Sequence, residues 1–257
     1  MMDKIRSKWQ VVLFVLCLFL VMQLVPTLLL GWVGVTDMSW LLFASFLLCL
    51  IMAFALRVVH LRELRQEGFW SVRSLCFSLC ALLLFESLAV LSENLDLPDI
   101  VGGVLLDVIR SPLGIFTIAL LGPLVEECFF RAGIEGHLLR LGAKPWVAIV
   151  VSSLFFSLIH GNPAQIPAAF VMGLVLGYAY LRTRSIVLPV IMHVFNNSLS
   201  VGLSYVAGLD KASDVYLSDY LGGPLVANVI ACVVIVGTLT YLVMEERKKR
   251  IRNGKFY

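Results

Sequence analysis

The sequence predicts an all-α, polytopic membrane protein, a bundle of about eight transmembrane helices. Of its 257 residues, 60% are hydrophobic and only 14% are charged, and the mean hydropathy is +0.94. Soluble domains are roughly half apolar and a quarter charged, so this composition leaves no separate soluble domain of any size. The apolar stretches are too long, and alternate too little, for membrane-spanning strands. Residues 1–257 are therefore expected to form a single transmembrane domain.

Runs of about 20 apolar residues, separated by charges or by Gly and Pro, mark the expected helices. They lie at Trp9–Val33, Trp40–Val59, Leu75–Leu91, Pro112–Phe130, Pro145–His160, Ile166–Leu181, Ile186–Val206 and Pro224–Met244. The first is too long for a cleaved signal peptide and is expected to be retained, with a kink at Pro26. The fourth is expected to continue as helix over Gly133–Leu141, beyond the membrane. Gly173 and Gly177 are expected to allow close packing of the sixth helix.

The basic residues predict the orientation. If Lys4, Arg6 and Lys8 are cytoplasmic and eight helices cross the membrane, every Lys and Arg except Arg110 and Lys211 is cytoplasmic. Because basic residues gather on the cytoplasmic side, both termini are expected there. The tail ERKKRIRNGK is expected to face phospholipids of the lipid bilayer, and the net charge of +3 gives no reason to expect a nucleic acid partner. The compact chain with short loops favours a prokaryotic plasma membrane, and nothing in it predicts an oligomeric state.

Three charged residues occur close together at the end of an apolar segment. Glu126, Glu127 and Arg131, in the sequence EECFFR, lie at the end of the apolar segment Pro112–Phe130, where hydrocarbon is the expected neighbour. A charge at mid-bilayer costs about 2.5–3.5 kcal/mol, so this group requires mutual pairing or a polar cavity. Most other polar residues expected inside the membrane lie on the next helix and on the seventh, among them His160, His193 and Asn197.

The spacing of these residues predicts a division of roles. Glu127 and Arg131 are four residues apart, so they share a helix face and are expected to pair. Glu126 is about 100° around the helix and is left to face a cavity. A carboxylate in such a cavity is suited to take a proton from water, which predicts hydrolysis. His160 is expected to orient that water or share its proton, and His193 with Asn197 to donate hydrogen bonds to an oxyanion.

The three motifs together resemble those of a known family. EECFFR (as EExxxR), FSLIH (FxxxH, Phe156 to His160) and HVFNN (HxxxN, His193 to Asn197) resemble the CAAX prenyl protease and bacteriocin-processing (Abi) family of intramembrane proteases, related to the type II CAAX endopeptidase. The resemblance covers residues 113–206. It implies an intramembrane glutamic endopeptidase with an eight-helix plan and no cofactor. Glu126 would be the catalytic glutamate, His160 its partner, and His193 with Asn197 the oxyanion-stabilising pair, with Glu127 and Arg131 in support.

The substrate implied is a peptide or protein in or at the membrane, either a prenylated protein, a secreted-peptide precursor or another membrane protein. Two alternatives remain open. Glu126, His160 and His193 would instead bind a zinc ion that activates water, although no compact HExxH-like ligand pair occurs. The other alternative is a protein without catalytic activity, either a scaffold or immunity-type protein or an ion-coupled carrier, although no inverted repeat supports a carrier.

Simple helix geometry opposes a single site. At 1.5 Å rise per residue, Glu126 is shallow on the cytoplasmic side, whereas His160 lies about 22 Å from Pro145, near the far face. Kinks at Pro123 and Pro189, or a fifth helix that begins in the cytoplasm, are expected to bring the residues together.

Overall fold

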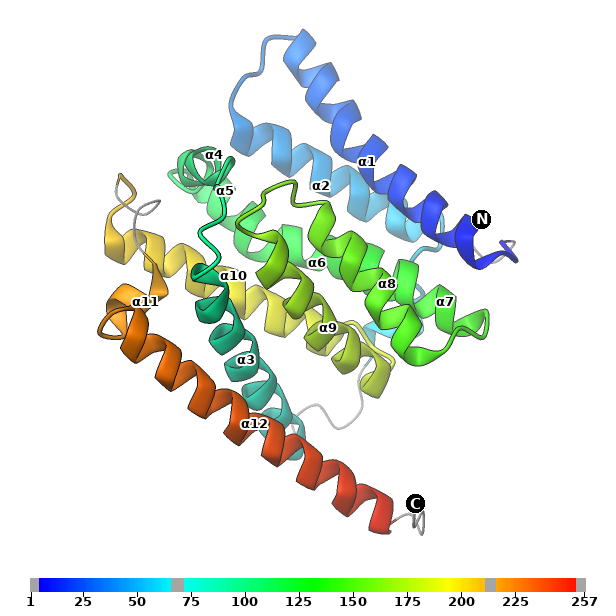
Figure 1. The fold of residues 1–257 in the computed structure, drawn as a ribbon. Helices are drawn as coiled ribbons and strands as arrows, with labels where there is room; N and C mark the ends of the chain where they lie inside the picture. The colour runs from blue at the N-terminus through cyan, green and yellow to red at the C-terminus, as the bar shows by residue number, and fades with distance from the viewer. Residues whose placement is uncertain (1–4, 66–71, 211–215, 253–257) are drawn as a thin grey trace. The chain divides into compact units, whose positions relative to one another are not determined.

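The computed structural model describes residues 5–65, 72–210 and 216–252. This part of the chain is almost entirely helical and contains no strand, which confirms the all-α prediction. The chain divides into two compact units, Met1–Glu67 with Asp99–Asp214 and Gly68–Pro98 with Val215–Tyr257 (Figure 1). Lys4, Lys211 and the last residues of the basic tail, on which the predicted orientation partly depends, lie outside the described residues.

The protein is a multi-pass integral membrane protein by the length and apolar character of its helices. Among the described residues, seven helical segments are long and apolar enough to cross a membrane. Their outward faces are apolar as well, as in α12, where Leu225 and Val233 are 78% and 67% exposed. In water such surfaces would be costly, whereas in lipid they are the favoured ones.

The fifth expected span is shorter than predicted. The helix there, α8 (Pro145–Leu158), has 14 residues and ends before His160, so it falls short of the roughly 20 residues needed to span the bilayer. His160 lies in the turn that follows, and its backbone N–H contacts the Ser157 carbonyl at 3.3 Å. Gly161 then adopts a positive φ of 61°, a conformation that glycine tolerates best.

Two antiparallel-paired helices begin the first unit. The first, α1 (Lys8–Trp32), runs through Pro26 without a break in the helix and packs on α2 (Met38–Ala55). Asp37 caps the start of α2 by accepting a hydrogen bond from the Ser39 N–H at 2.8 Å. A short 3₁₀ turn, η2 (Leu61–Leu64), follows α2.

The segment Pro112–Arg140 is the centre of the first unit. In its most apolar 18-residue window 56% of the residues are buried, against 17–39% in the other six candidate spans. Ser111 caps its beginning by accepting from the Gly114 N–H at 2.9 Å, with Pro112 at the first helical position. Residues 128–138, expected to leave the membrane in part, are all buried within this unit.

This central segment changes its helical type along its length. It comprises α5 (Pro112–Phe116), the π-helix η3 (Thr117–Leu121), α6 (Gly122–Glu127), the π-helix η4 (Cys128–Gly136) and α7 (His137–Arg140). Pro123 lies in the first turn of α6, where a residue without an N–H helps to separate the two hydrogen-bonding patterns. Both glutamates are thus in a short α-helix between two π-helices, which are rare and often occur at functional sites.

Four further helices complete the first unit, namely α4 (Gly102–Val108), α8, α9 (Ile166–Thr183) and α10 (Val187–Ala207). The last three pack on the middle of the central segment, and Val108 of α4 lies against Gly114 near its beginning. Pro189 lies in the first turn of α10, so it begins the helix and does not interrupt it. Gly173 approaches Ser153 and Gly177 approaches Ile149, both of α8, so the close packing predicted for these glycines is confirmed.

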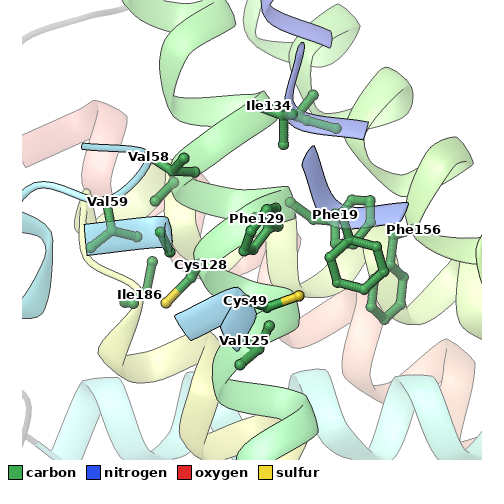
Figure 2. Packing of buried hydrophobic residues seen from close by; sticks show 14 of the residues in the cluster. Phe19, Cys49, Val58, Val59, Val125, Cys128, Phe129, Ile134, Phe156 and Ile186 are labelled. Carbon is green, nitrogen blue, oxygen red and sulfur yellow. The ribbon is translucent and has the colours of Figure 1, made fainter. Parts of the chain in front are cut away.

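Aromatic side chains connect the outer helices with the central one. Phe19 of α1 packs edge-to-face on Phe129 and Phe130 of η4, with ring centroids 5.2 and 5.6 Å apart. Phe130 in turn packs on Phe156 of α8 at 5.6 Å. Figure 2 shows this cluster, in which Cys128 and Phe129 come from the glutamate-bearing segment and Phe156 from α8. The buried rings therefore fix α1 and α8 against the segment that carries the charges.

The second unit contains α3 (Val72–Glu93), α11 (Leu217–Tyr220) and α12 (Pro224–Arg252), with α3 and α12 side by side (Figure 1). Asn94 and Asn228 exchange side-chain hydrogen bonds of 3.0 and 3.1 Å between the two long elements. Glu93 accepts from the backbone N–H groups of Leu217 and Ser218 at 3.1 and 3.3 Å. These contacts join the ends of the two segments into one unit.

Candidate active site

The ion pair expected from the four-residue spacing forms inside the first unit. Arg131 Nε lies 3.1 Å from Glu127 Oε2, and neither side chain is exposed. The Arg131 guanidinium also lies over the ring of Phe156, with Cζ 4.5 Å from the ring centroid. A buried charge needs such compensation, since the surroundings offer no water to solvate it.

His193 of α10 lies between the two glutamates. Its Nδ1 contacts Glu127 Oε1 at 2.9 Å, and its Nε2 lies 3.7 Å from Glu126 Oε2. An ionised carboxylate can only accept, so Nδ1 carries the hydrogen and Nε2 faces Glu126. Glu127 thus fixes the orientation of the imidazole, as the carboxylate does in a Ser-His-Asp triad.

Glu126 is the more accessible of the two carboxylates. Its side chain is 13% exposed, against none for Glu127, and its buried Oε2 has no hydrogen-bond partner among the described residues. The cysteine thiols in this part of the chain are all free. Glu126 therefore has an oxygen available for a reacting group, whereas both oxygens of Glu127 are engaged by Arg131 and His193.

Phe156 brings the second histidine to the same place. Its ring is 5.1 Å from the ring of His160 and 5.6 Å from that of His193, both edge-on. Ser152, one turn earlier on α8, donates a 2.7 Å hydrogen bond to the Phe130 carbonyl and so holds α8 against η4. The short α8 thus places Phe156 in contact with His160 just beyond its end, with His193 of α10 and with the Arg131 guanidinium.

His160 is fixed by its own helix end. Its Nδ1 contacts the Phe156 carbonyl at 2.8 Å, and because a carbonyl only accepts, Nδ1 carries the hydrogen. Nε2 is left to accept a proton or a hydrogen bond. Asn162, two residues after His160, is fully buried. Its Nδ2 donates to Asp99 Oδ1 at 2.8 Å, and its Oδ1 accepts from the Ile100 N–H at 3.1 Å. These bonds hold the turn that carries His160.

Asn197 is engaged by groups outside the histidine and glutamate cluster. Its Nδ2 donates a 3.0 Å hydrogen bond to the Ile118 carbonyl of the π-helix η3, and its Oδ1 accepts from Asn196 at 3.1 Å. Carbonyls in a π-helix differ in partner from those of a regular α-helix, and Asn197 satisfies one of them. Its expected part in binding an oxyanion therefore stays a prediction.

The burial of Glu135 was not expected from the sequence. Glu135 of η4 is fully buried, and neither of its carboxyl oxygens has a hydrogen-bond partner among the described residues. It lies in the stretch that was expected to leave the membrane. Its spacing of four residues from Arg131 was the available signal, since Glu127, Arg131 and Glu135 form a regular series.

The zinc alternative finds no preformed site. In the described part of the chain, no three His, Cys, Asp or Glu side chains are grouped so that they could hold a metal ion. Zinc sites require three or four such ligands at about 2.0–2.3 Å.

The comparisons with known proteins concern this same segment. Residues 108–199 match the family model described as type II CAAX prenyl endopeptidase Rce1-like. This segment of the chain is similar to Rce1-like CAAX protease domains. All the residues of the candidate site, from Glu126 to Asn197, fall within it. Therefore the resemblance read from the three motifs is confirmed.

Relatives of the Rce1-like domain occur in bacteria and in a plant. The chain is 36% identical over 97 residues to the membrane-embedded CAAX protease MroQ of Staphylococcus aureus, covering 36% of this chain and 39% of the relative. It is 32% identical over 98 residues to the putative membrane peptidase YdiL of Bacillus subtilis, covering 38% and 40%. The CAAX prenyl protease 2 of Arabidopsis thaliana is 25% identical over 132 residues, covering 44% and 42%.

Each match thus spans about two fifths of the relative's length. No solved structure matches the chain with comparable significance.

Proposed function

We propose that the protein is an intramembrane endopeptidase of the glutamic type, in which Glu126 activates the water that cleaves a peptide bond. The observation that carries this proposal is the position of His193. It is fixed by Glu127, which pairs with Arg131, and its Nε2 faces Glu126 Oε2, a buried oxygen that makes no hydrogen bond to the described residues. A base, an oriented imidazole and a buried surrounding are the parts that hydrolysis requires.

The reaction would proceed in two stages. Glu126 takes a proton from water while the oxygen of that water attacks the carbonyl carbon of the peptide bond. The carbonyl oxygen becomes an oxyanion, which a doubly protonated His193 stabilises by donating a hydrogen bond from Nε2. The proton held by Glu126 then passes to the leaving nitrogen, and the carbon–nitrogen bond breaks. The products are a carboxylic acid and an amine, and the protein is regenerated.

His160 would act on the same water. Its Nε2 is the free nitrogen, because Nδ1 is engaged by the Phe156 carbonyl. An acceptor nitrogen in a partly buried site can orient a water molecule or share its proton. Both histidines contact the ring of Phe156, which supports a shared site.

The substrate would be a peptide or protein segment in or at the membrane, either prenylated, a secreted-peptide precursor or a segment of a membrane protein. The relatives named above are a CAAX protease, a putative membrane peptidase and a CAAX prenyl protease, which supports peptide substrates. We further propose a prokaryotic plasma membrane with both termini in the cytoplasm, on the distribution of basic residues.

The test is Glu126→Gln in purified protein and in cells. Glutamine is nearly isosteric but cannot act as a base, so cleavage is expected to fall by about 10²–10⁴-fold. Peptide termini compared between cells with the native protein and with the variant would identify the substrate. Full function in cells that carry Glu126→Gln would refute the peptidase proposal and favour the scaffold or immunity alternative.

A further inference from the structure

The charges in the central segment do not balance around Arg131. Along one helix run Glu127, Arg131 and Glu135 follow one another at intervals of four residues, and all three side chains are fully buried. Glu127 is divided between two partners, Arg131 at Oε2 and His193 at Oε1. One carboxylate therefore serves both a permanent cation and the imidazole of the proposed reaction.

The unsatisfied groups of Arg131 and Glu135 are complementary. Arg131 Nη1 and Nη2 are buried and make no hydrogen bond to the described residues, and the same is true of Glu135 Oε1 and Oε2. Guanidinium nitrogens are donors only and carboxylate oxygens are acceptors, so each group has what the other lacks. The charged groups that act on Glu135 are Arg131, Glu127 and Arg184, with Tyr180 of α9 also close.

The packing of α9 leaves room for the Glu135 side chain. A Cβ atom placed on Gly177 would lie 2.8 Å from Glu135 Oε2. Only a residue without a side chain at this position allows the carboxyl group to lie between η4 and α9. The carboxyl group is thus accommodated by a specific feature of the neighbouring helix.

We propose that Glu135 is a positioning residue of the site, which acts as the second carboxylate of Arg131 and so leaves Glu127 to hold His193. When His193 is doubly protonated, Glu127 has two cations to compensate. Glu135 shares the Arg131 charge at that moment, so Arg131 does not draw the Glu127 side chain away from the imidazole. The role in the reaction rests on the proposed peptidase function, whereas the pairing with Arg131 does not.

The first experiment compares Glu135→Gln with Glu135→Leu in the full-length protein. Glutamine keeps an acceptor oxygen for Arg131, whereas leucine removes both the charge and the acceptor. We expect kcat to fall about tenfold in Glu135→Leu, with a smaller loss in Glu135→Gln and KM within about twofold, because the substrate does not contact Glu135. A residue that merely fills space would show the reverse order, since leucine is the better apolar filler.

The second experiment displaces Glu135 without changing its charge. Gly177→Ala would press on Oε2, and Gly173→Ala, one turn earlier on α9, is the matched control because its Cβ would meet Ser153 of α8 and no carboxylate. We expect Gly177→Ala to lower kcat more than Gly173→Ala does at equal thermal stability. Equal losses of kcat in the two variants would contradict the proposal.

A double-mutant cycle tests the pairing without any activity. In the native background Glu135→Gln is expected to lower the melting temperature, whereas in an Arg131→Met background it is expected to raise it, because it then removes an uncompensated acid. Glu63→Gln is the control, since Glu63 is buried but bonded to Tyr180 and Arg140. Its effect should add to that of Arg131→Met.

The cycle separates the two ways to fail. Additive effects of Glu135→Gln and Arg131→Met on the melting temperature would overturn the pairing whatever the activity. A native protein that cleaves no peptide, together with a non-additive cycle, would overturn the proposed function and leave the pairing in place.

Discussion

The same substitution at two adjacent residues is expected to have opposite consequences. Glu126→Gln should abolish cleavage and leave the fold intact, whereas Glu127→Gln should destabilise the fold. Glutamine has nearly the same shape as glutamate at both positions, so the difference arises from the charge that each environment needs. Glu127 lies 3.1 Å from Arg131 and 2.9 Å from His193 with no exposure, whereas Glu126 is 13% exposed with a free oxygen.

The size of the effect follows from the buried partner. Glu127→Gln removes the carboxylate that lies 3.1 Å from the buried Arg131 Nε, and breaking a buried pair in this way costs about 3–5 kcal/mol. For a chain of this size 1 kcal/mol corresponds to about 2–4 °C, so the melting temperature should fall by roughly 6–20 °C. Glu126→Gln removes no ion pair of comparable geometry, and its free energy of unfolding should change by less than about 1 kcal/mol.

Tryptophan fluorescence of detergent-solubilised protein measures the melting temperatures, since the chain contains five tryptophans. Cleavage of a membrane peptide substrate, assayed well below the lower melting temperature, measures the activity. The reasoning is refuted if Glu127→Gln melts with the native protein, or if Glu126→Gln is the less stable of the two. Either result would mean that the pair of Glu127 with Arg131 contributes little to the stability of the fold.

Three further outcomes are expected. Asn197→Ala should destabilise the fold by about 0.5–1.5 kcal/mol through the lost bond to the Ile118 carbonyl; if Asn197 also binds the oxyanion, kcat should fall by a further 10²–10³-fold. Gly114→Ala should destabilise the fold by about 1–3 kcal/mol, because its Cβ would lie 1.8 Å from the Val108 carbonyl oxygen. Gly202→Ala is the control, since its Cβ would meet nothing within 4 Å, and its melting temperature should match that of the native protein. Cleavage should survive a strong chelator, and a loss that zinc restores would establish the zinc alternative.

Much of the fold could be predicted from composition and from the lengths of the apolar runs. Every helix that crosses the hydrocarbon must be apolar over about 20 residues, so the membrane-spanning segments can be recognised in the sequence. The exception is instructive. The run Pro145–His160 was expected to cross the membrane, but the helix ends at Leu158, where a tight turn with Gly161 begins. A local apolar pattern does not reveal where tertiary contacts, such as those of Asn162, end a helix.

The candidate site could be predicted only in part. Pairing of Glu127 with Arg131 follows from spacing along one helix, which the sequence contains. The position of His193 between the two glutamates depends on how α10 packs on α6, which no spacing within one helix encodes. The burial of Glu135 was missed for a related reason, because polar residues after an apolar run were assigned to the outside. Two π-helices also escaped prediction, since their hydrogen-bonding pattern depends on packing.

The Glu127–Arg131 pair is not explained by stability. Apolar residues of the same volume are often equal to a buried ion pair or better, and each charge adds about 2.5–3.5 kcal/mol to the cost of membrane insertion. Two leucines at these positions would insert more readily, but leucine could not accept the Nδ1–H of His193. The Glu127 carboxylate accepts from that nitrogen at 2.9 Å, and Arg131 places a permanent cation 3.1 Å from the other oxygen of the same carboxylate. The pair therefore belongs to the orientation of His193, and through it to the free oxygen of Glu126.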